Sequence, residues 1–95
     1  MTCQFTIRNC MALDAHLDRL ARAGAGEVLM PAAALRAALW AARGHWRRPS
    51  RWPALERAAL EAARLRPPGL VAVPAQTMRE INEAARARLE KGAEK

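Results

Sequence analysis

The segment RGHWRRPSRW, residues 43–52, holds the side chains with the most evident chemistry in this chain of 95 residues. Arginine binds phosphate and carboxylate groups through a planar, bidentate guanidinium group. An indole ring can stack on a base or anchor a protein interface. The segment could therefore follow a nucleic-acid backbone or dock on an acidic protein surface. The expected contact residues are Arg43, His45, Trp46, Arg47, Arg48, Arg51 and Trp52.

The excess positive charge of the chain is concentrated around this segment. Residues 36–66 contain eight arginines and two glutamates, so this third of the chain supplies +6 of the formal net charge of +7. A GC-rich coding bias is an alternative explanation for the choice of Arg over Lys, but it does not explain where the charge lies. In another alternative, Trp40, Trp46 and Trp52 only pin the core or the loop, and the arginines are only solvated. The charge distribution favours a partner with negative charge.

The remaining reactive side chains do not form a recognisable site. Cys3, Cys10, His16 and His45 are the only thiols and imidazoles, and their spacing fits no standard zinc motif. Ser50 is the only serine, has no aspartate near it in the sequence, and is not part of a glycine-rich phosphate loop. We therefore expect no metal, no cofactor and no enzymatic activity.

Export and membrane signals are not evident in the sequence. No window approaches the ~18 consecutive apolar residues of a membrane span. The first residues lack the basic and apolar regions of a signal peptide. We expect a cytoplasmic protein with reduced cysteines and no membrane partner.

Hydrophobic periodicity predicts the elements that must hold the basic segment. Residues 3–7, CQFTI, alternate apolar and polar side chains, which is typical of a half-buried strand. Pro31 and Pro74 each follow a short apolar run and suit the first turn of a helix. Asp14 and Asp18 should be solvated charges near the start of the first helix, where the helix dipole favours acids. The expected strands are 3–7, 27–30 and 70–73, the expected helices are about 11–24, 31–42, 53–66 and 74–92, and 92–95 should be a frayed tail.

Two stretches of the chain nearly repeat each other. GEVLMPAAALRAALWAAR, residues 26–43, aligns without a gap with GLVAVPAQTMREINEAAR, residues 69–86, at an offset of 43. A lone strand of a few residues leaves its backbone groups unpaired, whereas two copies around a pseudo-twofold axis can pair antiparallel. We therefore expect one domain, 1–95, with repeat halves at about 11–43 and 53–86. In the alternative, strand–proline–helix is only a common pattern of alanine-rich chains.

The alignment makes two further statements about the repeat. Extended upstream, it pairs Leu17 with Leu60 and Asp18 with Glu61. It also sets Ala38 and Leu39 opposite Ile81 and Asn82, which suggests that the core registers of the two halves differ by one position.

The order of strand and helices resembles that of the ribbon–helix–helix DNA-binding proteins. VLMPAAALRAAL followed by PALERAALEAAR carries this resemblance over about half the chain. In that family, polar side chains of the paired strands read the major groove. The strand residues here are apolar, so we expect them to be buried on both faces, and the second copy has no following helix. We therefore do not assign the chain to that family.

The sequence as a whole predicts a small α+β domain, mainly helical, with about four helices and a minimal sheet of two or three strands. The leading function is that of a non-enzymatic binding protein for nucleic acid or a nucleoprotein complex. The rival is a protein-directed adaptor or inhibitor, similar in size to phage-type accessory proteins that block a host protein by occlusion. A homodimer formed through strand edges or alanine-rich faces is a further alternative.

Overall fold

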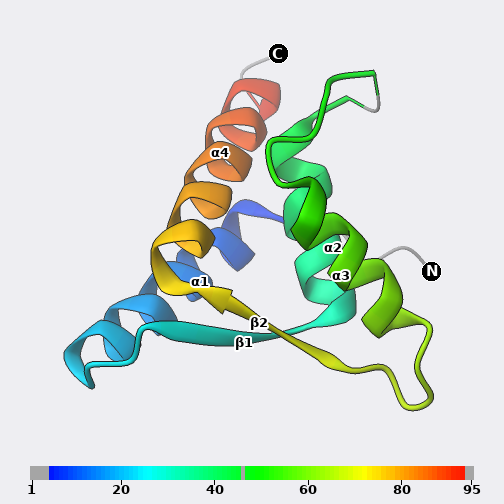
Figure 1. The fold of residues 1–95 in the computed structure, drawn as a ribbon. Helices are drawn as coiled ribbons and strands as arrows, with labels where there is room; N and C mark the ends of the chain where they lie inside the picture. The colour runs from blue at the N-terminus through cyan, green and yellow to red at the C-terminus, as the bar shows by residue number, and fades with distance from the viewer. Residues whose placement is uncertain (1–4, 46, 94–95) are drawn as a thin grey trace.

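The computed structural model describes residues 5–45 and 47–93 of the chain. Helices dominate it, and a two-stranded antiparallel sheet completes it, so the fold is α+β and mainly helical, as the sequence predicts. Figure 1 shows the elements in order along the chain. They are α1 (Ile7–Arg22), β1 (Glu27–Pro31), α2 (Ala32–Arg43), α3 (Pro53–Ala63), β2 (Leu70–Pro74) and α4 (Ala75–Ala93).

The two strands pair in the register that a twofold axis requires. Leu29 lies opposite Ala72, and these two residues are 43 positions apart, as are the aligned residues of 26–43 and 69–86. The Ala32 N–H donates to the Gly69 carbonyl at 3.2 Å, and its symmetry equivalent, the Ala75 N–H, donates to the Gly26 carbonyl at 2.9 Å. The predicted pairing of 27–30 with 70–73 is therefore confirmed, and each strand satisfies the backbone of the other.

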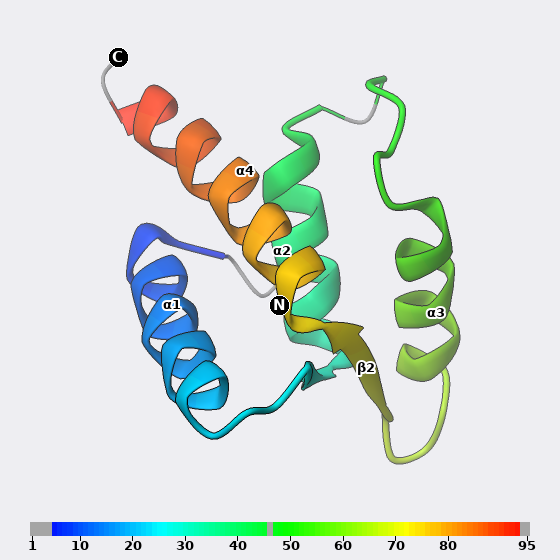
Figure 2. The same ribbon diagram turned by 60° about the vertical axis from the view of Figure 1, so that its left-hand side comes forward.

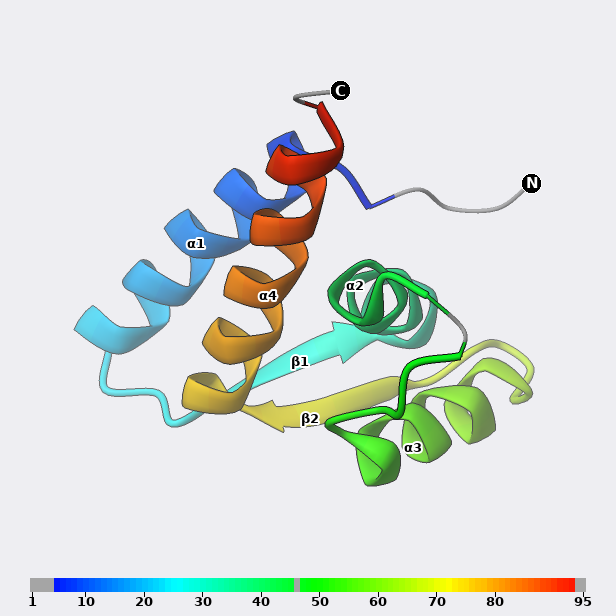
Figure 3. The ribbon, with the colours of Figure 1, turned by 90° about the horizontal axis from the view of Figure 1, so that it is seen from above.

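The helices all lie on one face of the sheet. Figure 2 shows them side by side in the order α1, α4, α2, α3. Helices α2 and α4 pack against each other at the centre, α1 packs on α4, and α3 packs on α2. Seen from above in Figure 3, α2 continues from β1 and α4 continues from β2, at opposite ends of the sheet. The arrangement of helices thus follows the same pseudo-twofold relation as the strands.

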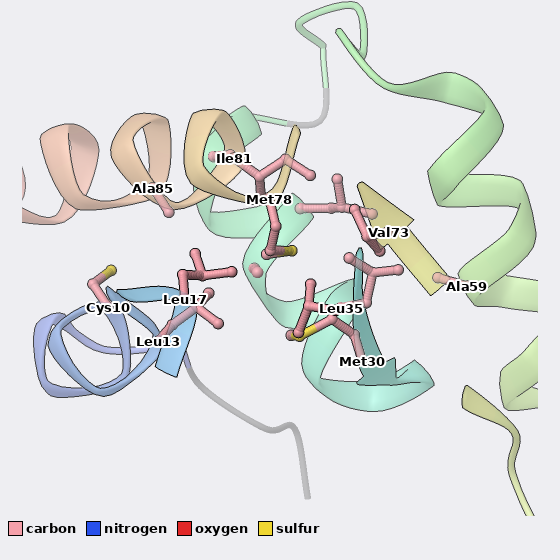
Figure 4. Packing of buried hydrophobic residues seen from close by; sticks show 14 residues of the cluster. Cys10, Leu13, Leu17, Met30, Leu35, Ala59, Val73, Met78, Ile81 and Ala85 are labelled. Carbon is pink, nitrogen blue, oxygen red and sulfur yellow. The ribbon is translucent and has the colours of Figure 1, made fainter. Parts of the chain in front are cut away.

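The core is built from the same positions of α2 and α4. Figure 4 shows Leu35, Met78, Ile81 and Ala85 meeting α1 and the inner face of the sheet. The suggestion that the two core registers differ by one position is wrong, because all four equivalent pairs are buried. These pairs are Leu35 and Met78, Ala38 and Ile81, Leu39 and Asn82, and Ala42 and Ala85.

The upstream extension of the alignment is also wrong by one position. Leu17 is buried, whereas Leu60, which the alignment pairs with it, is 38% exposed. The buried equivalent of Leu17 is Ala59, at an offset of 42. The offset changes because the linker between α3 and β2 is longer than the linker between α1 and β1. Helix α3 ends at Ala63, earlier than predicted.

The described part of the predicted strand at 3–7 belongs to the start of α1. Thr6 is the N-cap: its hydroxyl accepts from the Asn9 N–H at 3.2 Å, and the Asn9 side chain accepts from the Thr6 N–H at 2.8 Å. This capping box begins a helix at Ile7, where period two had suggested a strand. Cys3 and Gln4 lie outside the described residues. Asp14 and Asp18 are therefore not in the first turn of α1.

The strands are buried on one face only, against the prediction of burial on both. Val28 and Val73 face the helices and are buried, whereas Leu29 is 62% and Leu70 60% exposed. A two-stranded sheet covered on a single side leaves alternate side chains outside. In the predicted tail, Gly92 and Ala93 continue α4, and residues 94–95 lie outside the described part. None of the helices is long and apolar enough to cross a membrane within the described residues.

Candidate binding surface: the basic loop and the adjacent cleft

The predicted contact segment follows the sharp end of α2. Gly44 ends the helix in the left-handed conformation, with φ of 76°, and its N–H donates to the Trp40 carbonyl at 3.0 Å. Residues 44–52, called here the basic loop, then run to α3. Figures 1 and 2 show this loop at the end of the molecule opposite the sheet.

Local hydrogen bonds give the basic loop a defined shape. The Arg43 Nε donates to the Arg48 carbonyl at 2.6 Å, and Arg43 Nη1 lies 3.5 Å from Glu56 Oε1 of α3. The Arg48 N–H donates to the His45 carbonyl at 3.0 Å, and the Arg47 N–H donates to His45 Nδ1 at 3.1 Å. Arg43 is half-buried and acts as an anchor of the loop.

The other predicted contact residues differ in how they are presented. His45, Arg47, Arg48 and Arg51 are exposed. Trp52 is half-buried against the core, and the Arg51 guanidinium lies 4.6 Å from the centre of its ring. Such a cation–π contact holds Arg51 over the indole. Trp46 lies outside the described residues.

The serine of the loop has a structural contact. Its hydroxyl, Ser50 Oγ, accepts a hydrogen bond from the Trp52 N–H at 3.1 Å. This contact fixes the chain just before Pro53, where α3 begins. Proline suits the first turn of a helix because its missing N–H would have no partner there.

An open cleft of about 1390 Å³ adjoins the loop along α2. It lies between the N-terminal segment before α1, the outer side of α2, α3, and the last turns of α4. Four arginines and one glutamate line it, so its charge is strongly positive. The charged lining residues are Arg8, Arg36, Arg43, Arg88 and Glu56, and the large apolar ones are Phe5, Ile7, Leu39, Trp40, Leu60 and Leu89.

The sequence interpretation missed Trp40 and Arg36 as site residues. Trp40 is 55% exposed, and Arg36 is exposed one helical turn before it. A signal for them was present, because both lie on the side of the helix opposite the buried stripe of Leu35, Ala38 and Ala42.

Arg88 joins the end of α4 to the end of α2. Its Nε donates to the Ala42 carbonyl at 2.7 Å, which satisfies one of the unpaired carbonyls at the helix end. Its side chain also lies directly over Gly44, where an added Cβ would be 2.6 Å from Arg88 Cδ. Gly44 is therefore needed for its conformation and for this close approach.

A buried polar cluster joins α1 to α4, away from the cleft. The Asn82 side chain donates to the Cys10 carbonyl at 3.0 Å and to Asp14 Oδ1 at 2.9 Å. Cys10 is a free thiol, and its burial, with a smaller effect of Asp14, raises its pKa. A thiol with a raised pKa stays protonated and is a poor nucleophile.

No three His, Cys, Asp or Glu side chains of residues 5–45 and 47–93 form a group that could hold a metal ion.

Comparison with protein-family models, with curated proteins and with solved structures gives no match to this chain.

Proposed function

We propose that the protein is a small non-enzymatic binding protein that docks its basic loop on a negatively charged partner, nucleic acid or a nucleoprotein complex. The observation that carries the proposal is the exposure of Arg47, Arg48 and Arg51 on a loop that contains no acidic residue. Exposed arginines that contact phosphates release condensed counterions, which is the main source of affinity for nucleic acid.

Two features of the loop support this role. Arg43 binds the Arg48 carbonyl of the loop and Glu56 of α3, and so holds the loop against α3. The arginine side chains of the loop are therefore presented from a fixed backbone at one end of the molecule. Arg51 is held over Trp52, which limits the side-chain entropy lost when Arg51 binds a phosphate. As part of the same proposal, we place the protein in the cytoplasm, where the free thiol of Cys10 is stable.

A protein-directed adaptor or inhibitor is the second candidate. The specific observation in its favour is the exposed indole of Trp40 in a cleft that is apolar as well as basic. Trp and Arg are the residues that most often anchor protein interfaces.

Self-association of the protein stays a prediction, and light scattering over a concentration series tests it.

Fluorescence anisotropy with labelled single-stranded and duplex oligonucleotides tests the nucleic-acid proposal. With three phosphate contacts, the affinity for duplex should fall roughly 20- to 50-fold between about 50 and 200 mM salt. The triple variant Arg47→Ala, Arg48→Ala, Arg51→Ala should lose nearly all of this binding and most of the salt dependence.

A matched control removes the same charge elsewhere. Arg19→Ala, Arg22→Ala, Arg64→Ala changes three exposed arginines outside the loop, so the net charge of the two triple variants is equal. The control variant should keep most of its affinity. Equal losses in both variants would mean that net charge, and not the loop, drives binding, and the proposal would then fail.

A further inference from the structure

Ion pairs at equivalent places let the two helix pairs be compared position by position. Arg43 Nη1 lies 3.5 Å from Glu56 Oε1, and Arg86 Nη1 lies 3.5 Å from Asp14 Oδ2. The arginines are 43 positions apart and the acids 42, which are the offsets of the buried core positions. The pair of α3 on α2 is therefore equivalent to the pair of α1 on α4.

The next ion pair exists on one side only. On the α1–α4 side, Arg79 Nη2 lies 2.8 Å from Asp18 Oδ1. The equivalent residues on the α2–α3 side are Arg36 and Leu60, and both line the cleft. Within the described ranges 5–45 and 47–93, no carboxylate forms an ion pair with Arg36. The α2–α3 side therefore has the arginine but carries a leucine at the place of the acid.

A second surface position also carries an acid on the α1–α4 side and an apolar residue on the α2–α3 side. Glu83, which is exposed on α4, corresponds to the exposed Trp40 on α2. The α2–α3 side thus combines a basic cleft with two exposed apolar side chains, Trp40 and Leu60, at positions where the other side carries carboxylates. Exposed apolar side chains surrounded by charged ones are typical of a surface that binds another protein.

We propose that the cleft binds an acidic amphipathic segment of a partner protein, which supplies the carboxylate that Arg36 lacks and covers Trp40 and Leu60. Charge complementarity selects an acidic segment, because four arginines face a single glutamate that already pairs with Arg43. The planar guanidinium of Arg36 can bind a carboxylate with two hydrogen bonds.

The lining of the cleft favours a protein segment over nucleic acid. Phe5, Ile7 and Leu89 are half-buried and offer no hydrogen bonds to sugars or base edges, whereas they can contact the apolar face of a helix laid in the groove. The inference does not depend on nucleic-acid binding by the basic loop, because Arg36, Trp40 and Leu60 all lie outside residues 44–52.

The probe is a fluorescein-labelled amphipathic peptide with leucines at helical spacing and glutamates flanking them, beside a version with every Glu replaced by Gln. The Glu peptide should bind the protein at least about tenfold tighter than the Gln peptide, since one charge-assisted contact is worth that factor. Arg36→Ala and Trp40→Ala should each lower the affinity about tenfold or more. Arg19→Ala and Leu70→Ala, at exposed positions outside the cleft, should leave it unchanged.

Leu60→Asp gives the sharpest test, because it copies the α1–α4 side. The introduced carboxylate should pair with Arg36, so peptide affinity should fall about tenfold or more while the protein unfolds at the same urea concentration or a higher one.

The proposal is overturned if neither peptide binds, or if Leu60→Asp and Arg36→Ala bind as the wild type does. It is also overturned if a single-stranded oligonucleotide competes for the cleft with the same dependence on Arg36 and Trp40, since the cleft would then be a nucleic-acid site. Loss of oligonucleotide binding by the loop variant, with peptide binding intact, would separate the two proposals.

Discussion

Leu29 pairs with Ala72 across the sheet, and the two are also equivalent residues of the repeated halves. A pair of equivalent residues at the centre of the ladder places the pseudo-twofold axis between them. The axis relates β1 to β2 and α2 to α4, so the two central helices meet as symmetric partners. The basic loop lies between the two halves, and the cleft lies on the α2–α3 side, so neither is repeated by the pseudo-twofold axis.

Equivalent core positions should contribute similarly to stability. Leu35 and Met78 are fully buried at matching places on α2 and α4. Leu35→Ala and Met78→Ala should each lower the free energy of unfolding by about 2–5 kcal/mol, through lost burial and the cavity left behind. Urea denaturation followed by circular dichroism measures this. Leu29→Ala, at an exposed position of the sheet, should cost less than about 1 kcal/mol; a cost equal to that of the core variants would contradict the burial pattern.

Substitutions at Gly44 and Gly24 should distinguish the cost of a left-handed backbone from the cost of steric crowding by a neighbouring side chain. Both have a positive φ, of 76° and 77°, but an added Cβ at Gly24 meets nothing within 4 Å, whereas at Gly44 it meets Arg88. Gly24→Ala should cost about 1 kcal/mol for the left-handed conformation. Gly44→Ala should cost about 1 kcal/mol more, because Arg88 must give up its hydrogen bond to Ala42. The extra cost should vanish when both variants are compared in an Arg88→Ala background, and its persistence there would refute the explanation.

Asn82 should stabilise the contact between α1 and α4. Its side chain is 1% exposed and supplies the donors for the Cys10 carbonyl and for Asp14. Asn82→Ala should lower the free energy of unfolding by about 1–3 kcal/mol, since both acceptors lose their partner. A double-mutant cycle with Asp14→Ala measures the coupling, which we expect to be about 1 kcal/mol. Strictly additive effects of the two substitutions would show that the hydrogen bond between them does not contribute.

The buried thiol of Cys10 predicts a loss of stability at alkaline pH. Because burial raises its pKa in the folded protein, the thiol stays protonated there while the unfolded chain ionises above about pH 8.5. The unfolded state then binds fewer protons than the folded state, so the free energy of unfolding falls as the pH rises from about 8.5 towards the folded pKa. Urea titrations over this range should show a shallower slope for Cys10→Ala than for the wild type. An identical slope would mean that the thiol is not the titrating group.

Much of the fold could be predicted from local patterns. The apolar runs before Pro31 and Pro74 predicted two strands feeding two helices, and the repeat predicted how the strands pair. The predicted strand is wrong for the described residues 5–7, because a short alternating pattern does not distinguish a strand from an extended cap residue followed by a helix. The deciding signal was the cap, Thr6 with Asn9, whose reciprocal hydrogen bonds start α1.

The candidate site was only partly predictable. Arginines in a loop without acids are visible in the sequence, whereas the cleft depends on which helices pack together. The sequence alone does not tell whether Trp40 lies in the core, whereas the structure leaves it 55% exposed in the cleft that Leu60 also lines. Arg36 is recognised as a candidate binding residue only because its equivalent, Arg79, forms an ion pair with Asp18. Those two residues are 61 positions apart, so the sequence does not show that they meet.

The most direct test of the central claim is an amide NMR titration of the protein with a short single-stranded oligonucleotide at low salt. Binding by the basic loop predicts that the largest shifts fall on the amides of the described loop residues 44–45, 47–48 and 50–52, and that raising the salt reverses them. Shifts centred on α1 and α4, or no shifts at all at low salt, would contradict it.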